Sequence, residues 1–421
     1  MQYIADFHIH SRFSRACSKE LTLANLDATC RIKGVQIIGT GDMTHPEWFR
    51  EIRSELVETE DLSGLYRHRD ALDNQVLFTL TTELALIYKD EERVRRLHLV
   101  VHAPNIEAAS ELNRQLGERF NLKSDGRPIL GVSAPDLVKL CLKIHPQFLI
   151  YPAHIWTPWF SVFGSKSGFN SMEACFKDQA KFIYAYETGL SSDPAMNWRV
   201  SQLDKLSLLS SSDAHSLPNI AREATVFDLS NCPTYAEIFE VIKNCDWSKI
   251  IKTLEFYPEE GMYHFDGHRD CSVSFEPKQT MKLGGICPVC KKPLIIGVAN
   301  RAEELADRPD GYHLKGAPGF VKLIELDKII AEACGVKSRT SVKVRLMYDT
   351  LIKTLGSELD ILMHCSIEAI AQVAGERVAE GVRRVRTGEI SIVPGFDGQY
   401  GRISIFKQST TNNVRGQNKL L

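Results

Sequence analysis

The amino-acid sequence predicts an α/β domain that is followed by a small cysteine-rich module and a mostly helical C-terminal domain. Short apolar, β-branched segments alternate with amphipathic segments through the first 250 residues of the 421-residue chain. This order is typical of βαβ units with mainly parallel strands. The alternation stops near residue 256, where Pro, Gly, Cys and His become frequent, and residues 321–387 return to a helical periodicity. The predicted domains are residues 1–253, 254–300 and 301–421.

Seven apolar segments have the length and composition of strands. They are YIADFHI, GVQIIGTGD, VLFTLTTELALIY, LHLVVHAP, FLIYPAH, FIYAYETG and LSLLSSSDAH. Amphipathic segments such as LTLANLDATCRIKG lie between them and end at Gly or basic residues, as helices often do. About seven strand–helix units favour a barrel-like sheet, although a doubly wound sheet fits the same pattern. In the C-terminal domain we expect helices in VKLIELDKIIAEACG, TSVKVRLMYDTLIKTLG and ILMHCSIEAIAQVAGERVAEGVRRVRTG, and a hairpin in EISIVPGFDGQYGRISIF.

The composition disfavours membrane and secreted proteins. Hydrophobic residues make up 43% of the chain and charged residues 25%, which is ordinary for a soluble globular protein. The apolar runs PLIIGVA and QFLIYPA are far shorter than the roughly 18–20 residues of a membrane helix. The start, MQYIADFHIH, lacks the basic and apolar stretches of a secretory signal. Most of the 11 cysteines are scattered singly, as in proteins of a reducing compartment, so we expect a cytoplasmic protein.

The net charge of −2 conceals an uneven distribution. Residues 1–280 carry 30 Lys and Arg against 38 Asp and Glu, whereas residues 281–421 carry 21 against 15. The C-terminal third is therefore basic, which hints at a polyanionic partner such as DNA.

Histidine and carboxylate residues recur in or directly after the expected strands. They are Asp6, His8 and His10 in the first strand, Asp42 and His45 after the second, Glu83 in the third, His98 and His102 in the fourth, His154 after the fifth, and Asp213 and His215 after the last. In parallel α/β barrels the carboxyl ends of the strands build the active site, so we expect these side chains on one rim. Imidazole with carboxylate suits Zn, Mn or Fe, and a bridging carboxylate allows more than one ion. Clustered carboxylates would otherwise repel one another and be costly to bury.

The motifs DFHIHS, GTGDMTH, TTE, LHLVVHAP, YPAH and SSDAHS resemble those of the PHP (polymerase and histidinol phosphatase) superfamily of metal-dependent phosphoesterases. The resemblance covers residues 1 to about 230 and implies a distorted seven-stranded (βα) barrel that holds two or three divalent ions, Zn, Mn or Mg. The implied metal ligands are His8, His10, Glu83, His98, His154, Asp213 and His215, with Asp42 or His45 in addition.

Two features depart from the PHP pattern. The segment RFSRACS offers no Asp soon after His-x-His, and Asp42 is followed by Met43 rather than by His. The choice between Asp42 and His45 as a ligand therefore stays open. Among the ligands, we expect Asp213, Glu83 and His154 to take part in catalysis, with Glu83 as a bridging carboxylate.

Three cysteines are clustered, unlike the others. Cys287 and Cys290 form the motif CPVC, and Cys271 lies sixteen residues before it. A CxxC turn beside Pro and Gly is typical of a zinc knuckle, because the turn directs both thiolates at one ion. GHRDC supplies His268 as the fourth ligand, and His264 is the competing candidate. A disulfide or a redox-active pair is the alternative, but no βαβ pattern flanks the motif. We predict one structural zinc.

The order of the three modules resembles the endonuclease Q family of repair nucleases over essentially the whole chain. GVANRAEELADRP and GERVAEGVRR…PGFDGQYG complete the match beyond the zinc module. The resemblance implies cleavage of a DNA strand on the 5′ side of a deaminated base (uracil, hypoxanthine or xanthine) or of an abasic site. We therefore expect duplex DNA with a flipped damaged base as the partner, and a location at the nucleoid.

Two segments carry the side chains that we expect to contact DNA. The helical segment GERVAEGVRRVRTG can neutralise phosphates, although a solvated helix face is an equally good explanation of its charge. The segment IWTPWFSVFGSKSGF can stack on an extruded base, although a hydrophobic lid on the barrel explains its aromatic residues as well. The candidates are Arg377, Arg383, Arg384 and Arg386 in the first segment and Trp156, Trp159 and Lys166 in the second.

Three other functions are compatible with parts of this pattern. They are a small-molecule phosphatase of the same superfamily, such as one acting on histidinol phosphate, a nonspecific or proofreading nuclease, and a non-catalytic DNA-damage binder. The zinc module and the basic C-terminal domain argue against the phosphatase, because a compact substrate needs no long charged platform. The complete set of candidate ligands argues against the non-catalytic binder.

Overall fold

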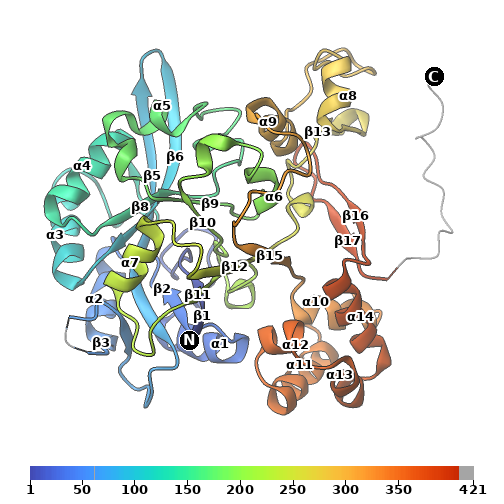
Figure 1. Ribbon diagram of the computed structural model, residues 1–421, viewed down its shortest axis with the longest axis horizontal. Coiled ribbons are helices and arrows are strands. Elements are labelled where there is room, and N and C mark those ends of the chain that lie inside the picture. The colour runs from blue at the N-terminus through green and yellow to red at the C-terminus, as the bar shows by residue number, and fades with distance from the viewer. Residues whose placement is uncertain (61, 407–421) are drawn as a thin grey trace.

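The computed structural model describes residues 1–60 and 62–406. It consists of an α/β body, drawn in blue to green, a small yellow module and a group of orange and red helices (Figure 1). Residues 407–421, the end of the predicted domain 301–421, lie outside the described residues. None of the described helices combines the length and the apolar character that crossing a membrane requires.

A sheet of 11 strands forms the centre of the α/β body. Its strands are β1 (Gln2–Asp6), β2 (Ile37–Gly39), β3 (Leu56–Glu58), β4 (Tyr66–His68), β5 (Leu77–Asp90), β6 (Arg93–Ala103), β7 (Ile129–Leu130), β8 (Leu149–Pro152), β11 (Ala224–Asp228), β12 (Ile250–Glu255) and β15 (Gly319–Lys322). The longest path runs β15-β12-β11-β1-β2-β5-β4-β3, while β6 and β7 pair with β5 and β8 pairs with β6. Two further strands, β9 (Ala185–Glu187) and β10 (Ser207–Leu209), pair in parallel as a separate sheet. Each of the seven predicted strand segments contains one of these strands, so the α/β prediction is confirmed.

The expectation of mainly parallel strands is wrong for β6 and β11. Each of them runs antiparallel to both of the strands with which it pairs. The reason for β6 is local, because only Glu91 and Glu92 separate it from β5, and Glu91 has a φ of 53°. A two-residue turn can join only antiparallel strands. The sequence pattern did not reveal this turn, because both strands continue into the charged sequence KDEERVRR, which has no apolar alternation.

Helices pack on both faces of the sheet. They are α1 (Leu23–Lys33), α2 (Pro46–Glu55), α3 (Ile106–Gly117), α4 (Ala134–Ile144), α5 (Met172–Phe176), α6 (Pro194–Asn197) and α7 (Tyr235–Lys243). One hydrophobic cluster contains Leu26 of α1, Trp48 of α2 and Leu112 of α3. A second cluster contains Phe7 and Phe239, and it covers the other face with α7. Burying both faces fixes the sheet and hence the residues at its strand ends.

The remaining chain forms the yellow module and the C-terminal helices (Figure 1). The module contains β13 (Asp266–His268), β14 (Val273–Phe275) and α8 (Pro277–Lys282), and α9 (Val298–Leu305) follows it. The C-terminal elements are α10 (Leu326–Ala333), α11 (Val342–Leu355), α12 (Glu358–Met363), α13 (Ile367–Ala374), α14 (Glu376–Thr387), β16 (Ser391–Val393) and β17 (Arg402–Ser404). They confirm the predicted helices and hairpin. The boundaries of the three predicted domains stay a prediction, and β15 of the third pairs with β12 of the α/β body.

A buried ion pair joins the C-terminal helices to the α/β body. Lys33 Nζ of α1 lies 2.9 Å from Glu358 Oε2 of α12, and both side chains are buried. The same carboxylate accepts hydrogen bonds from Leu326 N and from the Tyr348 hydroxyl. A charged pair that is buried in this way stays favourable only while all of its partners remain in place.

Candidate metal centre and its surroundings

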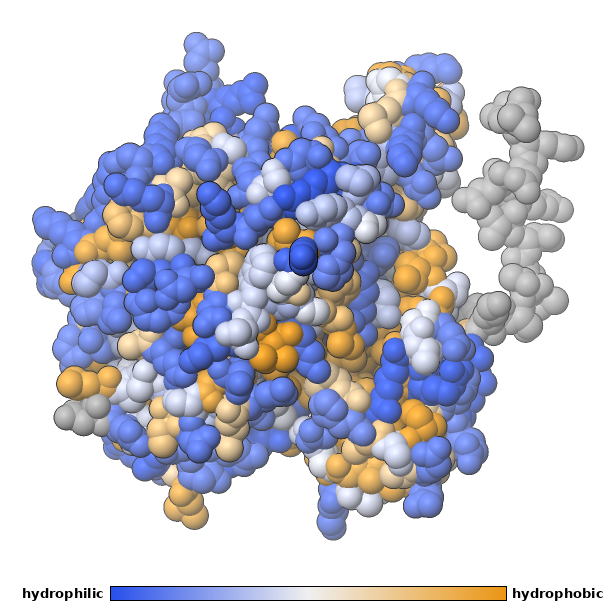
Figure 2. Space-filling model, in the orientation of Figure 1, coloured by the Kyte–Doolittle hydropathy of each residue, from blue (hydrophilic) through white to orange (hydrophobic). Residues whose placement is uncertain are grey.

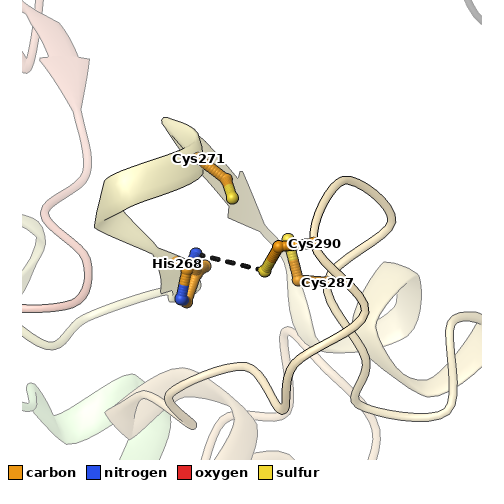
Figure 3. Close-up of side chains that lie close together, drawn as sticks. All are labelled: His268, Cys271, Cys287 and Cys290. Carbon is orange, nitrogen blue, oxygen red and sulfur yellow. Dashed lines mark hydrogen bonds between the residues drawn. The ribbon is translucent and has the colours of Figure 1, made fainter.

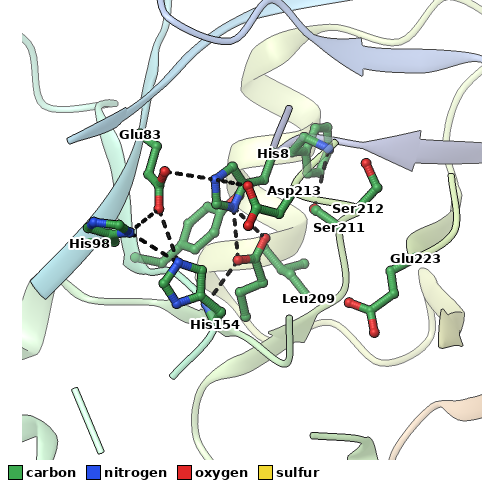
Figure 4. Close-up of polar contacts among 12 residues, drawn as sticks. His8, Glu83, His98, His154, Leu209, Ser211, Ser212, Asp213 and Glu223 are labelled. Carbon is green, nitrogen blue, oxygen red and sulfur yellow. Dashed lines mark hydrogen bonds and ion pairs between the residues drawn. The ribbon is translucent and has the colours of Figure 1, made fainter. Parts of the chain in front are cut away.

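Two groups of potential metal ligands lie at one end of the sheet and share Glu83. The first group holds His8, His10, Glu83 and Asp213, and the second holds Glu83, His98 and His154; within each group the ligand atoms lie within 4.8 Å of one another. Figure 4 shows how the side chains of five of them converge from separate segments of the chain: His8, Glu83, His98, His154 and Asp213.

The two oxygens of Glu83 face different groups. Oε2 lies 3.2 Å from His10 Nε2 and 3.5 Å from His8 Nε2. Oε1 lies 2.6 Å from His98 Nδ1 and 3.1 Å from His154 Nε2. This is the arrangement of a carboxylate that can bridge two ions, the role expected for Glu83.

Three residues in and around the centre have unusual backbone conformations. Asp42, His154 and Asp213 all have positive φ, at 46°, 30° and 46°. Non-glycine residues rarely adopt this region, and such strain concentrates at functional sites. The approach to His154 also depends on Gly189, because a Cβ there would lie 2.4 Å from the Cβ of His154.

The neighbours of the buried carboxyl groups in the centre keep these groups ionised. Burial alone would raise the pKa of Glu83, but His98, Arg127 and His8 hold it well below its ordinary value. The pKa of Asp213 is also lowered despite burial, by the hydrogen bond with His10 and the charge of His8. Burial lowers the pKa of His98 to about 4, so this imidazole is neutral and available as a ligand.

The donor set of the centre fits divalent metal ions. His8 Nε2 is buried and has no hydrogen-bond partner among the described residues, although its other nitrogen is bonded. Such an unpartnered nitrogen costs free energy unless a further group binds it. It points toward Glu83 and Asp213, 3.5 and 3.7 Å away, where an ion would also compensate the carboxylates.

Glu187 and Asp42 hold two of the histidines in position. Glu187, at the end of β9, lies 2.9 and 3.1 Å from His8 Nδ1 and accepts a hydrogen bond from His154 N. Asp42 lies 3.0 Å from His10 Nδ1 and accepts hydrogen bonds from the Ser11 and Ser14 hydroxyls. Carboxylates in this position fix the ring orientation and tautomer of a metal-binding histidine.

Sequence reasoning missed Glu187 and Arg127. Glu187 closes the segment FIYAYETG, and its strand-end position is the signal that could have found it. Arg127 Nη1 lies 2.8 Å from Glu83 Oε2, but the loop SDGRP that carries it has no strand pattern. The Arg127 side chain is 27% exposed whereas Glu83 is fully buried, so Arg127 forms part of the mouth of the centre.

Asp42 and His45, between which the choice of ligand stays open, lie beside the two ligand groups. Neither residue belongs to the two ligand groups among the described residues. Asp42 acts on His10, as described above, while His45 accepts a hydrogen bond from Trp48 N at the start of α2 and stacks on Phe13. His215 lies at the edge of the centre, with its ring centroid 4.5 Å from that of His10, and outside both groups.

The predicted DNA-contacting aromatic residues occupy different environments. Trp156 is fully buried, and its indole N–H donates a hydrogen bond to Asn197 Oδ1, so it cannot stack on a base. Trp159 is 38% exposed and packs edge-on against Tyr263 of the yellow module. Lys166 is exposed.

The predicted arginine cluster of α14 is largely satisfied by other parts of the protein. Arg383 pairs with Glu380 and Glu389, and Arg384 pairs with Glu380. Arg386 donates to the backbone carbonyls of Ile361, Leu362 and Cys365 at the end of α12. Arg377 lies over the ring of Phe406, 3.5 Å from its centroid. These contacts favour a structural role for Arg386 and weaken the case for a phosphate-binding surface on α14.

The yellow module brings the four predicted zinc ligands together. His268, Cys271, Cys287 and Cys290 offer ligand atoms within 4.8 Å of one another, as Figure 3 shows. Cys290 Sγ lies 3.7 Å from His268 Nδ1. Three thiols and one imidazole match a tetrahedral zinc site. His264, the competing candidate, lies outside the group, and its buried Nδ1 has no hydrogen-bond partner among the described residues.

Related sequences match the chain partly or throughout. A family model described as the MJ0043 C-terminal domain matches residues 325–389. The protein MJ0043 of Methanocaldococcus jannaschii is 32% identical over 256 residues, which are 60% of this chain and 32% of that protein, so the match spans about a third of that relative. The Bacillus subtilis protein YqxK is 28% identical over 416 residues, 95% of this chain and 98% of YqxK.

Two solved structures match over the full length. The lesion-specific endonuclease PfuEndoQ from Pyrococcus furiosus has a TM-score of 0.84 and 29% identity, with 98% of both chains covered. A structure of endonuclease Q with a 27-mer duplex substrate that has an abasic lesion at the active site has a TM-score of 0.83 and 29% identity, with 99% of both chains covered. The similarity therefore includes the α/β body, the yellow module and the C-terminal helices, and the chain resembles endonuclease Q over its full length.

Proposed function

We propose that the protein is a metal-dependent DNA repair endonuclease that hydrolyses the phosphodiester on the 5′ side of a deaminated base or an abasic site. The observation that carries this proposal is the pair of ligand groups that share Glu83, in a chain that matches a lesion-specific endonuclease from end to end. A complex of such an endonuclease with an abasic duplex supports duplex DNA as the partner.

His8, His10, Glu83 and Asp213 would hold one ion, and Glu83, His98 and His154 a second. Bound divalent ions lower the pKa of water toward neutrality and stabilise charge on a phosphate. The protein's own contribution is positional. Glu187 and Asp42 keep the imidazoles of His8 and His10 in orientation, so the ligands need no rearrangement when ions bind.

Arg127 supplies a fixed positive charge at the mouth of this centre. Its guanidinium contacts Glu83 on one side and is partly exposed on the other. A guanidinium in this position can donate N–H hydrogen bonds to a phosphate oxygen while it still compensates the negative charge of Glu83. Arg127 therefore extends the centre toward the substrate.

The proposal includes extrusion of the damaged nucleotide from the base stack, because an enzyme that recognises a damaged base must reach its edges. Trp159, which is 38% exposed on the loop that follows His154, is our candidate for contact with the extruded nucleotide. The zinc site of His268, Cys271, Cys287 and Cys290 would be structural, because its four protein ligands leave no open position.

A nicking assay tests the proposal. Purified protein with Mn²⁺, Mg²⁺ or Zn²⁺ is incubated with end-labelled duplexes that contain uracil, hypoxanthine, an abasic site or no lesion. We expect a nick on the 5′ side of the lesion that is lost in Asp213→Asn and retained in Asp178→Asn, a matched change at an exposed aspartate. If the protein leaves all lesion duplexes uncut but hydrolyses histidinol phosphate, it is instead a small-molecule phosphatase.

A further inference from the structure

A cationic groove lies between the β5–β6 hairpin and α9, outside the metal centre. Its volume is about 610 Å³, and its lining includes Arg93, Arg95, Lys166 and Arg301 but only one acidic residue, Glu304. The loop Gly164–Gly168, of sequence GSKSG, forms one wall. In Figure 1 the hairpin projects from the α/β body, and Figure 2 shows that its tip is hydrophilic.

Two of the four cationic residues, Arg301 and Arg95, hold the wall of the groove in place. Arg301 is 6% exposed and donates to the carbonyls of Phe163 and Phe169 and to Asn170 Oδ1, at 3.0, 3.0 and 2.7 Å. Arg95 donates to the carbonyl of Gly168 and lies 3.9 Å from the ring centroid of Phe169. These contacts hold the loop against the strand, so the wall is preorganised.

Two glycines of the loop have no room for a side chain. A Cβ at Gly168 would lie 2.5 Å from the carbonyl oxygen of Val162, and a Cβ at Gly164 would lie 2.6 Å from that of Thr157. Both neighbours are backbone atoms, which cannot move aside cheaply. The two glycines thus keep the loop compact and leave the Lys166 side chain on its exposed face.

The other two cations are available to a ligand. Arg93 and Lys166 are exposed, and neither has an ion-pair partner within the described part of the chain. The acidic residue of the groove is compensated, because Glu304 Oε2 lies 2.8 Å from Arg301 Nη1. Arg93 on β6 and Lys166 on the loop therefore present positive charge that is unpaired among the described residues, which complements a polyanion.

The same loop connects the groove to the metal centre. Phe160 accepts a hydrogen bond from His98 N, and its ring centroid lies 4.5 Å from that of His98. The Ser161 hydroxyl donates to the carbonyl of His154. Along β6, Arg95 precedes His98 by three residues, a distance of about 10 Å at strand geometry.

We propose that the cationic groove binds backbone phosphates of the DNA strand that enters the metal centre, with Arg93 and Lys166 as the phosphate-neutralising side chains. This inference rests on the proposed function, since it places the flanking DNA relative to the cleaved bond. It also replaces α14 as the main candidate for phosphate contacts, because the arginines of that helix are largely paired within the protein.

The test measures the dissociation constant of an abasic duplex at several salt concentrations for the full chain with its metals. Each lost phosphate contact lowers the salt slope by about 0.9 on logarithmic axes, so the double variant Arg93→Ala/Lys166→Ala should lose nearly two units of slope. The control, Arg119→Ala/Lys143→Ala, removes the same charge from exposed positions on the surface near α3 and α4 and should keep the wild-type slope.

The outcomes separate the two proposals. If Arg93→Ala/Lys166→Ala keeps the wild-type salt slope while the wild-type protein nicks lesion DNA, the proposed role of the groove is overturned. The proposed endonuclease function is then unaffected. A smaller slope in that variant, with an unchanged melting temperature and a wild-type slope in Arg119→Ala/Lys143→Ala, supports the groove. Failure of the wild-type protein to bind or nick any lesion duplex overturns both.

Discussion

Replacing Glu187 by Gln should weaken metal binding without removing a ligand. Both carboxylate oxygens of Glu187 lie within 3.1 Å of His8 Nδ1, and both side chains are buried. Glutamine keeps an oxygen that can accept the hydrogen bond from His154 N, but it loses the charge that orients His8. Loss of such an outer carboxylate typically costs 10–100-fold in metal affinity, which corresponds to about 1.4–2.8 kcal/mol.

The assay is a titration of the metal-free protein with Mn²⁺, followed by the binding signal and by the nicking rate at each concentration. We expect the dissociation constant of Glu187→Gln to rise 10–100-fold and the nicking rate to recover at saturating metal. Glu223→Gln is the matched control, because Glu223 is also buried but, among the described residues, accepts hydrogen bonds only from the backbone N–H groups of Leu190 and Phe256. Equal metal affinities in the two variants would refute the orienting role.

Three further predictions concern the stability of the fold and the zinc site of the yellow module. Burial raises the pKa of Glu223 to about 8, so the folded protein holds a proton that the unfolded chain releases above about 4.5. The free energy of unfolding should therefore fall as pH rises toward 8, by up to about 1.4 kcal/mol per unit, and Glu223→Gln should flatten this dependence in urea titrations at pH 5.5 and 8; an equal slope would contradict it. Lys33→Met should cost about 3–5 kcal/mol in the same assay because it leaves Glu358 buried without its cation, and the double variant with Glu358→Leu should recover part of this loss. A thiol-specific mercurial should release one zinc per chain, and Cys287→Ser should abolish this release while the metal that supports nicking stays bound; release that persists in the variant would place the zinc elsewhere.

Position in or directly after an apolar strand segment was the strongest signal in the sequence. Six residues that it identified, His8, His10, Glu83, His98, His154 and Asp213, lie together in the structure. It worked because a strand fixes where the side chains within it and at its end emerge, whatever the loop beyond it does. His45 and His102 carry the same signal but lie outside the two ligand groups, since one of them caps a helix and the other bonds to the Tyr151 hydroxyl.

Charge patterns in the sequence were less informative. The run GERVAEGVRRVRTG indicated a basic helix, but Glu380, Glu389 and the carbonyls at the end of α12 satisfy most of its arginines. The cations of the groove come from β6, a loop and α9, which are far apart in sequence. Composition counts charges, whereas availability depends on which partners the fold places beside each one.

By itself, the sequence determined the α/β body, the seven strand segments, the C-terminal helices and the residue types of both metal sites, because periodicity and ligand spacing are local properties. Only the tertiary structure decided the antiparallel course of β11, the position of His268 rather than His264 beside the three cysteines, the orienting roles of Glu187 and Asp42, and the contact of Arg127 with Glu83. Each of these depends on the distance between residues that are remote in the chain. Such distances follow from how the sheet and its loops pack, and no local pattern records them.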